Sequence, residues 1–233
     1  MTRDHLLLPP VYSFYRSNIS PDIIESQAKV FKHLGIDLIQ CLDDRVSHSD
    51  WLDRVFNEDR DLTVVCDIDA FPLSRAAYIR FIERVRLGAV VGLEQVANHL
   101  DLSATYAGPM FLGCLSQIYQ DLGRPSLAHT ERMDVGQNLT IAAEKRGVTI
   151  EMIAPQFAIL PKWPLADRGI FGIGTFYGSL DFFHLFESRK DSSIALFKAV
   201  SECVVGGKHD FARYLAEVAQ TPIPKKRRKF WSF

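Results

Sequence analysis

The sequence predicts an α/β protein with a mostly parallel central sheet and helices on both faces. Through the first two-thirds of the chain, short apolar runs typical of strands alternate with segments whose apolar residues recur at helical spacing. Strands that alternate with helices pair in parallel, because a parallel neighbour needs a long crossover connection. The chain has 233 residues, of which 47% are hydrophobic and 24% charged, and this suits one domain with a sizeable core.

The N-terminal part shows this alternation most clearly. Val11–Tyr15 is rich in aromatic and β-prone residues and predicts the first strand. Ser20 and Pro21 are typical of the cap and first turn of a helix, and Gly35 is typical of its end. Ile36–Cys41 predicts the second strand.

Two further helices with a strand between them follow. Asp50–Asn57 carries its apolar residues at helical spacing, and Ser74 is the expected cap of a helix that runs to Leu87. Between them, Leu62–Cys66 is an apolar run that predicts a buried strand.

The middle of the chain continues the pattern. Ala89–Val91 predicts a strand, and Thr105–Leu115 is a second apolar stretch. Asp134–Lys145 predicts a helix that ends at Gly147, and Val148–Ile153 predicts the strand after it.

The composition changes in the last third. Residues 155–180 contain prolines and glycines among aromatic residues, so loops and short strands that build a binding surface are expected there. Helices are expected again at Ser192–Val205 and Lys208–Ala219. We therefore expect one domain over residues 1–220 and a separate tail over residues 221–233.

Two aspartates follow the apolar run 62–66 directly. Asp67 and Asp69 are two positions apart, and side chains at that spacing on a strand point to the same face. The end of a buried strand lies at the rim of the sheet, where open α/β folds bind ligands. Carboxylates suit Mg2+ or Mn2+, and these ions suit phosphates, so the pair predicts a metal–diphosphate site. The alternative is a polar strand end in which one aspartate caps a turn.

An apolar strand ending in Asp67-Ile68-Asp69, followed much later by an apolar strand ending in His184, resembles the GT-A-type glycosyltransferases, distantly the glycogenin-like ones. The resemblance covers the organisation of residues 10–190. It implies a GT-A-like, Rossmann-type central sheet with flanking helices and a smaller acceptor-side β region. The Asn-Xaa-Gly acceptor motif of glycogenin-like enzymes is absent, and residues 107–111 occupy roughly its place.

The resemblance also implies a cofactor and a donor. Asp67, Asp69 and His184 would bind Mn2+ or Mg2+, and the metal would hold the diphosphate of a nucleotide-sugar donor, expected to be a UDP-sugar. The alternative for His184 is a hydrogen-bonded core residue, because apolar residues surround it in the sequence.

The same resemblance implies roles outside the metal site. Asp134 would act as general base or orient the acceptor, with Glu131 as the second candidate; for Asp134 the alternative is capping of a helix. The first strand would lie under the nucleotide base, where Tyr12 and Tyr15 could stack and Arg16 could meet a phosphate. The alternatives are core packing for the tyrosines and solvent exposure for the arginine.

The predicted function is metal-dependent transfer of a sugar from a nucleotide-diphosphate-sugar to a glycan-type or lipid-linked acceptor. A phosphatase of the haloacid dehalogenase type is the alternative, because its motif is also a strand ending in Asp-Xaa-Asp. That class carries the motif on its first strand and needs a late Gly-Asp-Xaa-Xaa-Xaa-Asp motif, which is absent here. A non-catalytic relative that binds a sugar nucleotide is the third hypothesis.

Net charge and cysteine content limit the expected partners and the expected cellular compartment. The net charge of −1 gives no basic excess of the kind that nucleic-acid binding needs. The four cysteines are scattered without Cys-Xaa-Xaa-Cys spacing, as expected for buried thiols in a reducing compartment. The N-terminus lacks the apolar stretch of a signal peptide, and no run is long enough to span a bilayer, so a cytoplasmic location is expected.

The C-terminal tail is basic and aromatic. Lys225–Phe233 combines lysine and arginine with phenylalanine and tryptophan, which is typical of peripheral contact with anionic lipid. A solvated tail and a nuclear import signal are the alternatives.

Overall fold

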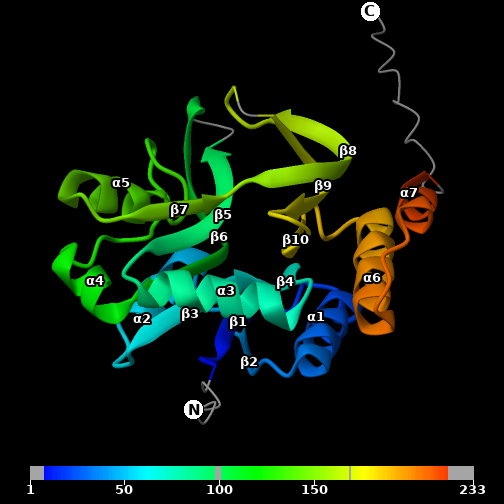
Figure 1. The fold of residues 1–233 in the computed structure, drawn as a ribbon, viewed down its shortest axis with the longest axis horizontal. Coiled ribbons are helices and arrows are strands. Elements are labelled where there is room, and N and C mark those ends of the chain that lie inside the picture. The colour runs from blue at the N-terminus through cyan, green and yellow to red at the C-terminus, as the bar shows by residue number, and fades with distance from the viewer. Residues whose placement is uncertain (1–7, 98–100, 168, 220–233) are drawn as a thin grey trace, which may run out of the picture.

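The computed structural model describes residues 8–97, 101–167 and 169–219. The described residues form a six-stranded sheet and a four-stranded sheet with helices packed against them (Figure 1). No helix within the described residues is long and apolar enough to cross a membrane. The basic tail lies outside the described residues, so its membrane contact and the division of the chain at residue 220 stay predictions.

The six-stranded sheet is mostly parallel. Its strand order is β2–β1–β3–β6–β5–β7, and β6 runs antiparallel to both of its neighbours, whereas the other pairs are parallel. In this order the strands span Leu38–Leu42, Val11–Tyr15, Leu62–Asp67, Asp101–Leu115, Val90–Ala97 and Ile150–Ile153.

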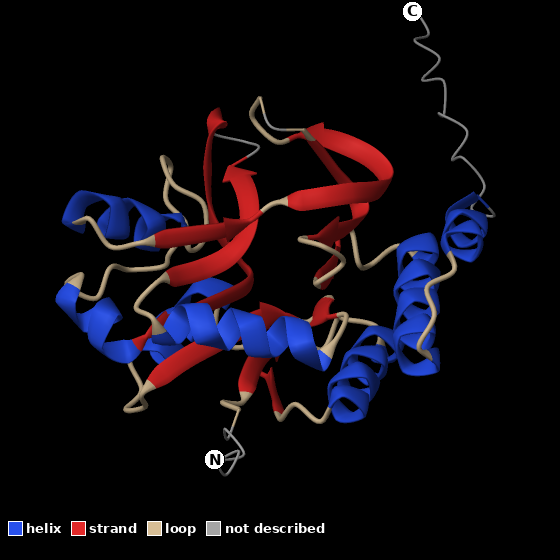
Figure 2. Ribbon diagram, in the orientation of Figure 1, coloured by secondary structure: helices blue, strands red, loops and turns tan. Residues whose placement is uncertain are grey.

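Helices cover both faces of this sheet (Figure 2). Buried side chains of α1, α3 and α6 belong to one core cluster, and those of α2, α4 and α5 belong to a second cluster on the opposite face, while α7 packs against α6. The described helices are α1 (Pro21–Leu34), α2 (His48–Phe56), α3 (Arg75–Arg86), α4 (Ser116–Asp121), α5 (Gln137–Arg146), α6 (Asp191–Gly206) and α7 (Phe211–Ala219). The predicted α/β class, with a mostly parallel central sheet and flanking helices, is confirmed.

Local capping signals set the helix ends as the sequence predicts. The side chain of Ser20 accepts a hydrogen bond from the backbone at the start of α1, and that of Ser74 does the same at the start of α3. Gly35 ends α1 with a φ of 62°, and Gly147 ends α5 with a φ of 67°, a left-handed conformation that glycine adopts without steric cost.

The four-stranded sheet is antiparallel and has the order β4–β10–β9–β8. In this order its strands span Ala70–Pro72, Phe182–Leu185, Ile170–Tyr177 and Pro155–Pro164. Because β4 follows β3 after two residues, this second sheet begins directly at the rim of the first.

The prediction of loops and short strands for residues 155–180 is wrong in part, because β8 and β9 form a long hairpin. Prolines fit in β8 because it is an edge strand, whose outward N–H groups are not needed for pairing. In β9, a Cβ on Gly172 would clash with the backbone oxygen of Leu160, so close approach of two chains requires this glycine. Neither reason is visible in the composition of the segment.

Candidate functional site

The carboxyl ends of β1 and β3 lie side by side where the strand order of the larger sheet reverses. From β1 the chain passes through α1 to β2 on one side, and it then returns through α2 to β3 on the other side of β1. The two helices pack on opposite faces of the sheet. Open α/β sheets bind ligands in the crevice that such a reversal leaves at the strand ends.

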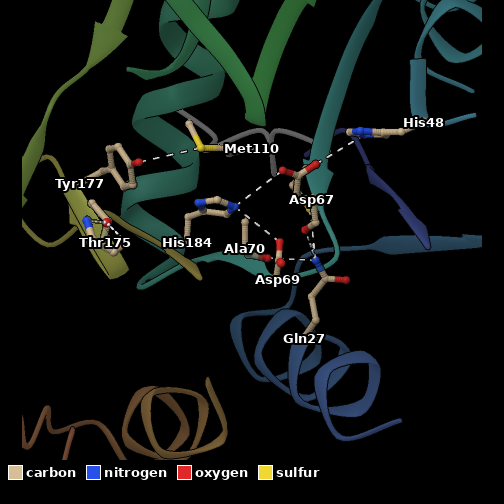
Figure 3. Close-up of polar contacts among 11 residues, drawn as sticks. Gln27, His48, Asp67, Asp69, Ala70, Met110, Thr175, Tyr177 and His184 are labelled. Carbon is tan, nitrogen blue, oxygen red and sulfur yellow. Dashed lines mark hydrogen bonds and ion pairs between the residues drawn. The ribbon is translucent and has the colours of Figure 1, made fainter. Parts of the chain in front are cut away.

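The two aspartates sit at the end of β3, in a segment that we call the aspartate turn (residues 67–70). Asp67 is the last residue of β3, and Asp69 belongs to the turn that leads into β4. A tight turn therefore brings the two carboxylates together, and the expected alternation along one strand is wrong. Ile68 between them is buried in the core, while both carboxylates face His184 (Figure 3).

His184 reaches the aspartates from the second sheet. The antiparallel pairing of β10 with β4 places His184 opposite Ala70. Its Nε2 lies 3.5 Å from Oδ1 of Asp69 and 3.6 Å from Oδ2 of Asp67. The structure thus brings together the three residues that the sequence analysis assigns to a metal.

Burial and neighbouring charges shift the pKa values of this cluster in opposite directions. Burial disfavours the charged form of His184, but hydrogen bonds to Asp67 and Asp69 raise its pKa to about 9. Burial likewise disfavours ionisation of Asp67, but its hydrogen bond to His184 and the nearby histidine charges hold its pKa below the usual value. Without a metal, the site therefore holds an imidazolium beside ionised Asp67.

The three residues fit a divalent cation. One ligand atom from each of Asp67, Asp69 and His184 lies within 4.8 Å of the others. Carboxylate oxygens with one imidazole nitrogen form a donor set that Mn2+ and Mg2+ accept. Nε2 of His184 faces both carboxylates, whereas Nδ1 is buried without a hydrogen-bond partner among the described residues. A cation bound by Nε2 would take the place of the proton there.

His48 belongs to the site, and the sequence analysis missed it. It is the first residue of α2, and its Nε2 lies 3.4 Å from Oδ1 of Asp67, so one carboxylate faces two histidines. Its ring packs with the rings of Phe14 and Trp51. A signal was available: Ser-Xaa-Xaa-Asp at residues 47–50 forms a capping box, which starts the helix at residue 48 rather than at residue 50.

A cavity of about 540 Å³ opens beside the cluster, within the range of roughly 300–1,000 Å³ that is usual for ligand pockets. Tyr15 and Arg16 line it from the end of β1, and Arg189 lines it from the segment after β10. Contact of Tyr15 and Arg16 with a nucleotide stays a prediction. Arg16 also donates a hydrogen bond of 2.7 Å to the backbone oxygen of Val46.

Asp134 lies on the wall of the same cavity. The hydroxyl of Tyr106 donates to Oδ2 of Asp134 at 3.0 Å, and the backbone N–H of Val135 donates to Oδ1 at 2.8 Å. Burial and the neighbouring charge of Asp134 raise the pKa of Tyr106, so the hydroxyl keeps its proton. Helix α5 begins only at Gln137 with Gly136 as its cap residue, so Asp134 does not cap it.

Two expected site residues do not reach the cavity. The ring of Tyr12 lies under the guanidinium of Arg60, 4.1 Å from its carbon, and packs against the core on the α2 side of the sheet. Glu131 is exposed and is not among the residues that line the cavity.

Comparisons with known proteins assign no family to this chain. No family model matches the chain, and a search of curated protein sequences finds no match. Among solved structures, A197 from STIV is similar at 11% identity and a TM-score of 0.43, over 70% of this chain and 93% of that one. A nucleotidyl transferase from Methanothermobacter thermautotroptrophicus is similar at 14% identity and a TM-score of 0.38, over 64% and 88%. Similarities at this level assign no function to the chain.

Proposed function

We propose that this protein is a metal-dependent glycosyltransferase that uses a nucleotide-diphosphate-sugar donor, expected to be a UDP-sugar. The observation that carries the proposal is the convergence of Asp67, Asp69 and His184 beside a large cavity, at the point where the strand order reverses. That convergence favours a metal-bound phosphate ligand over a purely structural ion pair.

The charges around the cavity support a donor that arrives with a cation. Asp67 and Asp69 would repel a diphosphate if they faced it alone. A divalent cation held by them and by His184 would neutralise the leaving nucleoside diphosphate as the sugar–phosphate bond breaks. Arg16 and Arg189 line the same cavity and add positive charge for the phosphates. Tyr15 would contact the nucleotide.

Asp134 is the proposed general base. In the proposed reaction, an acceptor hydroxyl oxygen bonds to the anomeric carbon, the bond from that carbon to the diphosphate breaks, and Asp134 takes the hydroxyl proton. Tyr106 would hold the carboxylate by donating to one of its oxygens. A glycan-type or lipid-linked hydroxyl compound is the expected acceptor.

A thermal-shift screen tests this function. Nucleotide-sugars are added with Mn2+ or with EDTA, and the melting temperature is measured, because a ligand that binds only the folded protein raises it. We expect a nucleotide-sugar to raise the melting temperature when Mn2+ is present and to lose this effect in EDTA. Absence of a shift with every nucleotide-sugar would contradict the proposal.

The phosphatase alternative predicts a different result. It requires Asp67 as a nucleophile, but the two carboxylate oxygens of Asp67 face His48 and His184. Metal-dependent release of phosphate from a phosphomonoester, without stabilisation by nucleotide-sugars, would favour that alternative. A shift with nucleotide-sugars but no transfer to any acceptor would favour the non-catalytic relative.

A further inference from the structure

Gln27 is a buried amide on a helix face that otherwise buries apolar side chains. It lies on α1 with Ile23, Val30 and Phe31, and all four are fully buried. An amide at such a position costs stability unless its polar atoms are hydrogen-bonded. Its partners therefore indicate why it is there.

The amide nitrogen of Gln27 makes its two shortest hydrogen bonds to the aspartate turn, and it also lies 3.4 Å from Sγ of Cys66. Nε2 donates to the backbone oxygen of Asp67 at 2.8 Å and to that of Ala70 at 2.9 Å (Figure 3). One side chain thus ties together the two ends of the segment that carries the candidate metal ligands.

Gln40 on β2 fixes which way the Gln27 amide points. Nε2 of Gln40 donates to Oε1 of Gln27 at 3.0 Å and to the backbone oxygen of Ile24 at 3.0 Å. The oxygen of Ile24 can only accept, so the atom of Gln40 beside it is the donating nitrogen. The atom of Gln27 that faces this nitrogen must then be its oxygen, which leaves the Gln27 nitrogen for the aspartate turn.

The middle of the aspartate turn is held from the other side. The backbone N–H of Leu185 donates to the backbone oxygen of Asp69 at 2.9 Å. Gln27 thus holds the turn at its two ends, while the residue after His184 holds its middle. These bonds together fix the aspartates relative to the histidine.

We propose that Gln27, oriented by Gln40, is a positioning residue that holds Asp67 and Asp69 in the geometry for metal binding. The inference rests on the metal site of the proposed function. Loss of the Gln27 amide would remove its hydrogen bonds to the backbone oxygens of Asp67 and Ala70, and the turn would shift to recover partners. Groups that support metal ligands in this way typically change metal affinity by about 10- to 100-fold when they are replaced.

Three variants separate positioning from general stabilisation. Gln27→Met keeps a similar side-chain size but removes both donors. Gln40→Leu keeps the Gln27 donors and removes the bond that orients them, together with the bond from Gln40 to the backbone oxygen of Ile24. It therefore tests the proposal even if Gln27→Met does not fold. Ser201→Ala is the matched control, because the Ser201 hydroxyl donates to a backbone oxygen of α1, that of Ser26, at 3.1 Å without contacting the aspartate turn.

Mn2+ affinity is measured from the free-ion signal in electron paramagnetic resonance, well below the melting temperature of each variant. We expect Gln27→Met to raise the Kd for Mn2+ by about tenfold or more. Gln40→Leu should raise it less, and Ser201→Ala should leave it unchanged even if its melting temperature falls. An unchanged Kd in both glutamine variants would overturn the proposal.

Amide hydrogen exchange in the metal-free protein tests the same inference without Mn2+. The N–H of Leu185 should exchange faster in both glutamine variants than in the wild type, and Ser201→Ala should leave it protected. Equal protection in all of the proteins would overturn the positioning role. If the wild type binds no Mn2+, the proposed function fails, and the exchange rate of Leu185 still decides whether Gln27 positions the turn.

Discussion

Metal binding at the candidate site should compete with a proton on His184. Hydrogen bonds to Asp67 and Asp69 raise the pKa of this histidine to about 9, so its Nε2 is protonated at neutral pH. The pKa of Asp67 is held below its usual value, so this carboxylate has no proton to lose in the same range. A cation that binds Nε2 must therefore release a proton.

The size of the effect follows from that pKa. Each pH unit below about 9 lowers the fraction of neutral His184 about tenfold and raises the apparent Kd for Mn2+ by the same factor. Between pH 6 and pH 8 the affinity for Mn2+ should thus rise roughly 100-fold. The affinity for Mn2+ must rise with pH rather than fall, because the proton and the metal compete for the same nitrogen of His184.

Calorimetric titration with Mn2+ at pH 6, 7 and 8 measures this dependence. Repeating one titration in buffers with different ionisation enthalpies gives the number of protons released, which we expect to be close to one for each Mn2+ bound. His184→Gln, which cannot titrate here, should bind Mn2+ more weakly and lose the pH dependence. A wild-type affinity that is constant from pH 6 to pH 8, with no proton release, would refute the reasoning.

The metal-free protein should lose stability as the pH rises from about 6.5 through about 9, because the raised pKa of His184 contributes stability that is fully present only below the unfolded value. Urea unfolding that shows no such loss between pH 6.5 and 9.5 would argue against it. Asp134→Asn should lower turnover by about 100-fold or more and leave Mn2+ affinity unchanged, and near-normal turnover would exclude Asp134 as the base. Gly172→Ala should destabilise the protein by about 1–3 kcal/mol, because the added Cβ would clash with the backbone. Gly206→Ala is the control and should be neutral or stabilising, because its Cβ meets nothing within 4 Å. Equal urea midpoints for the two variants would contradict this.

Structural features that depend on a few neighbouring residues could be predicted from the sequence. Ser20 and Gly35 mark the ends of α1 because each acts through backbone groups within one turn of helix. The three candidate metal ligands could also be proposed, since Asp67 and Asp69 follow a buried strand and His184 lies in a second apolar run.

Features that depend on distant contacts could not be predicted. β6 runs antiparallel, and nothing in its composition distinguishes it from a parallel strand. Gln27 is an ordinary polar residue of a helix until the fold places the aspartate turn beside it. Tyr12 and Tyr15 are three positions apart on β1, so their side chains point to opposite faces of the sheet. Which face meets the cavity depends on the packing of the whole sheet: Tyr15 lines the cavity, whereas Tyr12 packs on the other face.

Binding of UDP to the protein, measured by calorimetry with Mn2+ and again with EDTA, tests the metal–diphosphate site most directly. We expect Mn2+ to tighten binding of UDP by tenfold or more in the wild type, on the order of 1.4 kcal/mol. Asp69→Ala should lose this gain, since it removes one of the three candidate ligands. The same dependence on Mn2+ in the wild type and in Asp69→Ala would contradict the account.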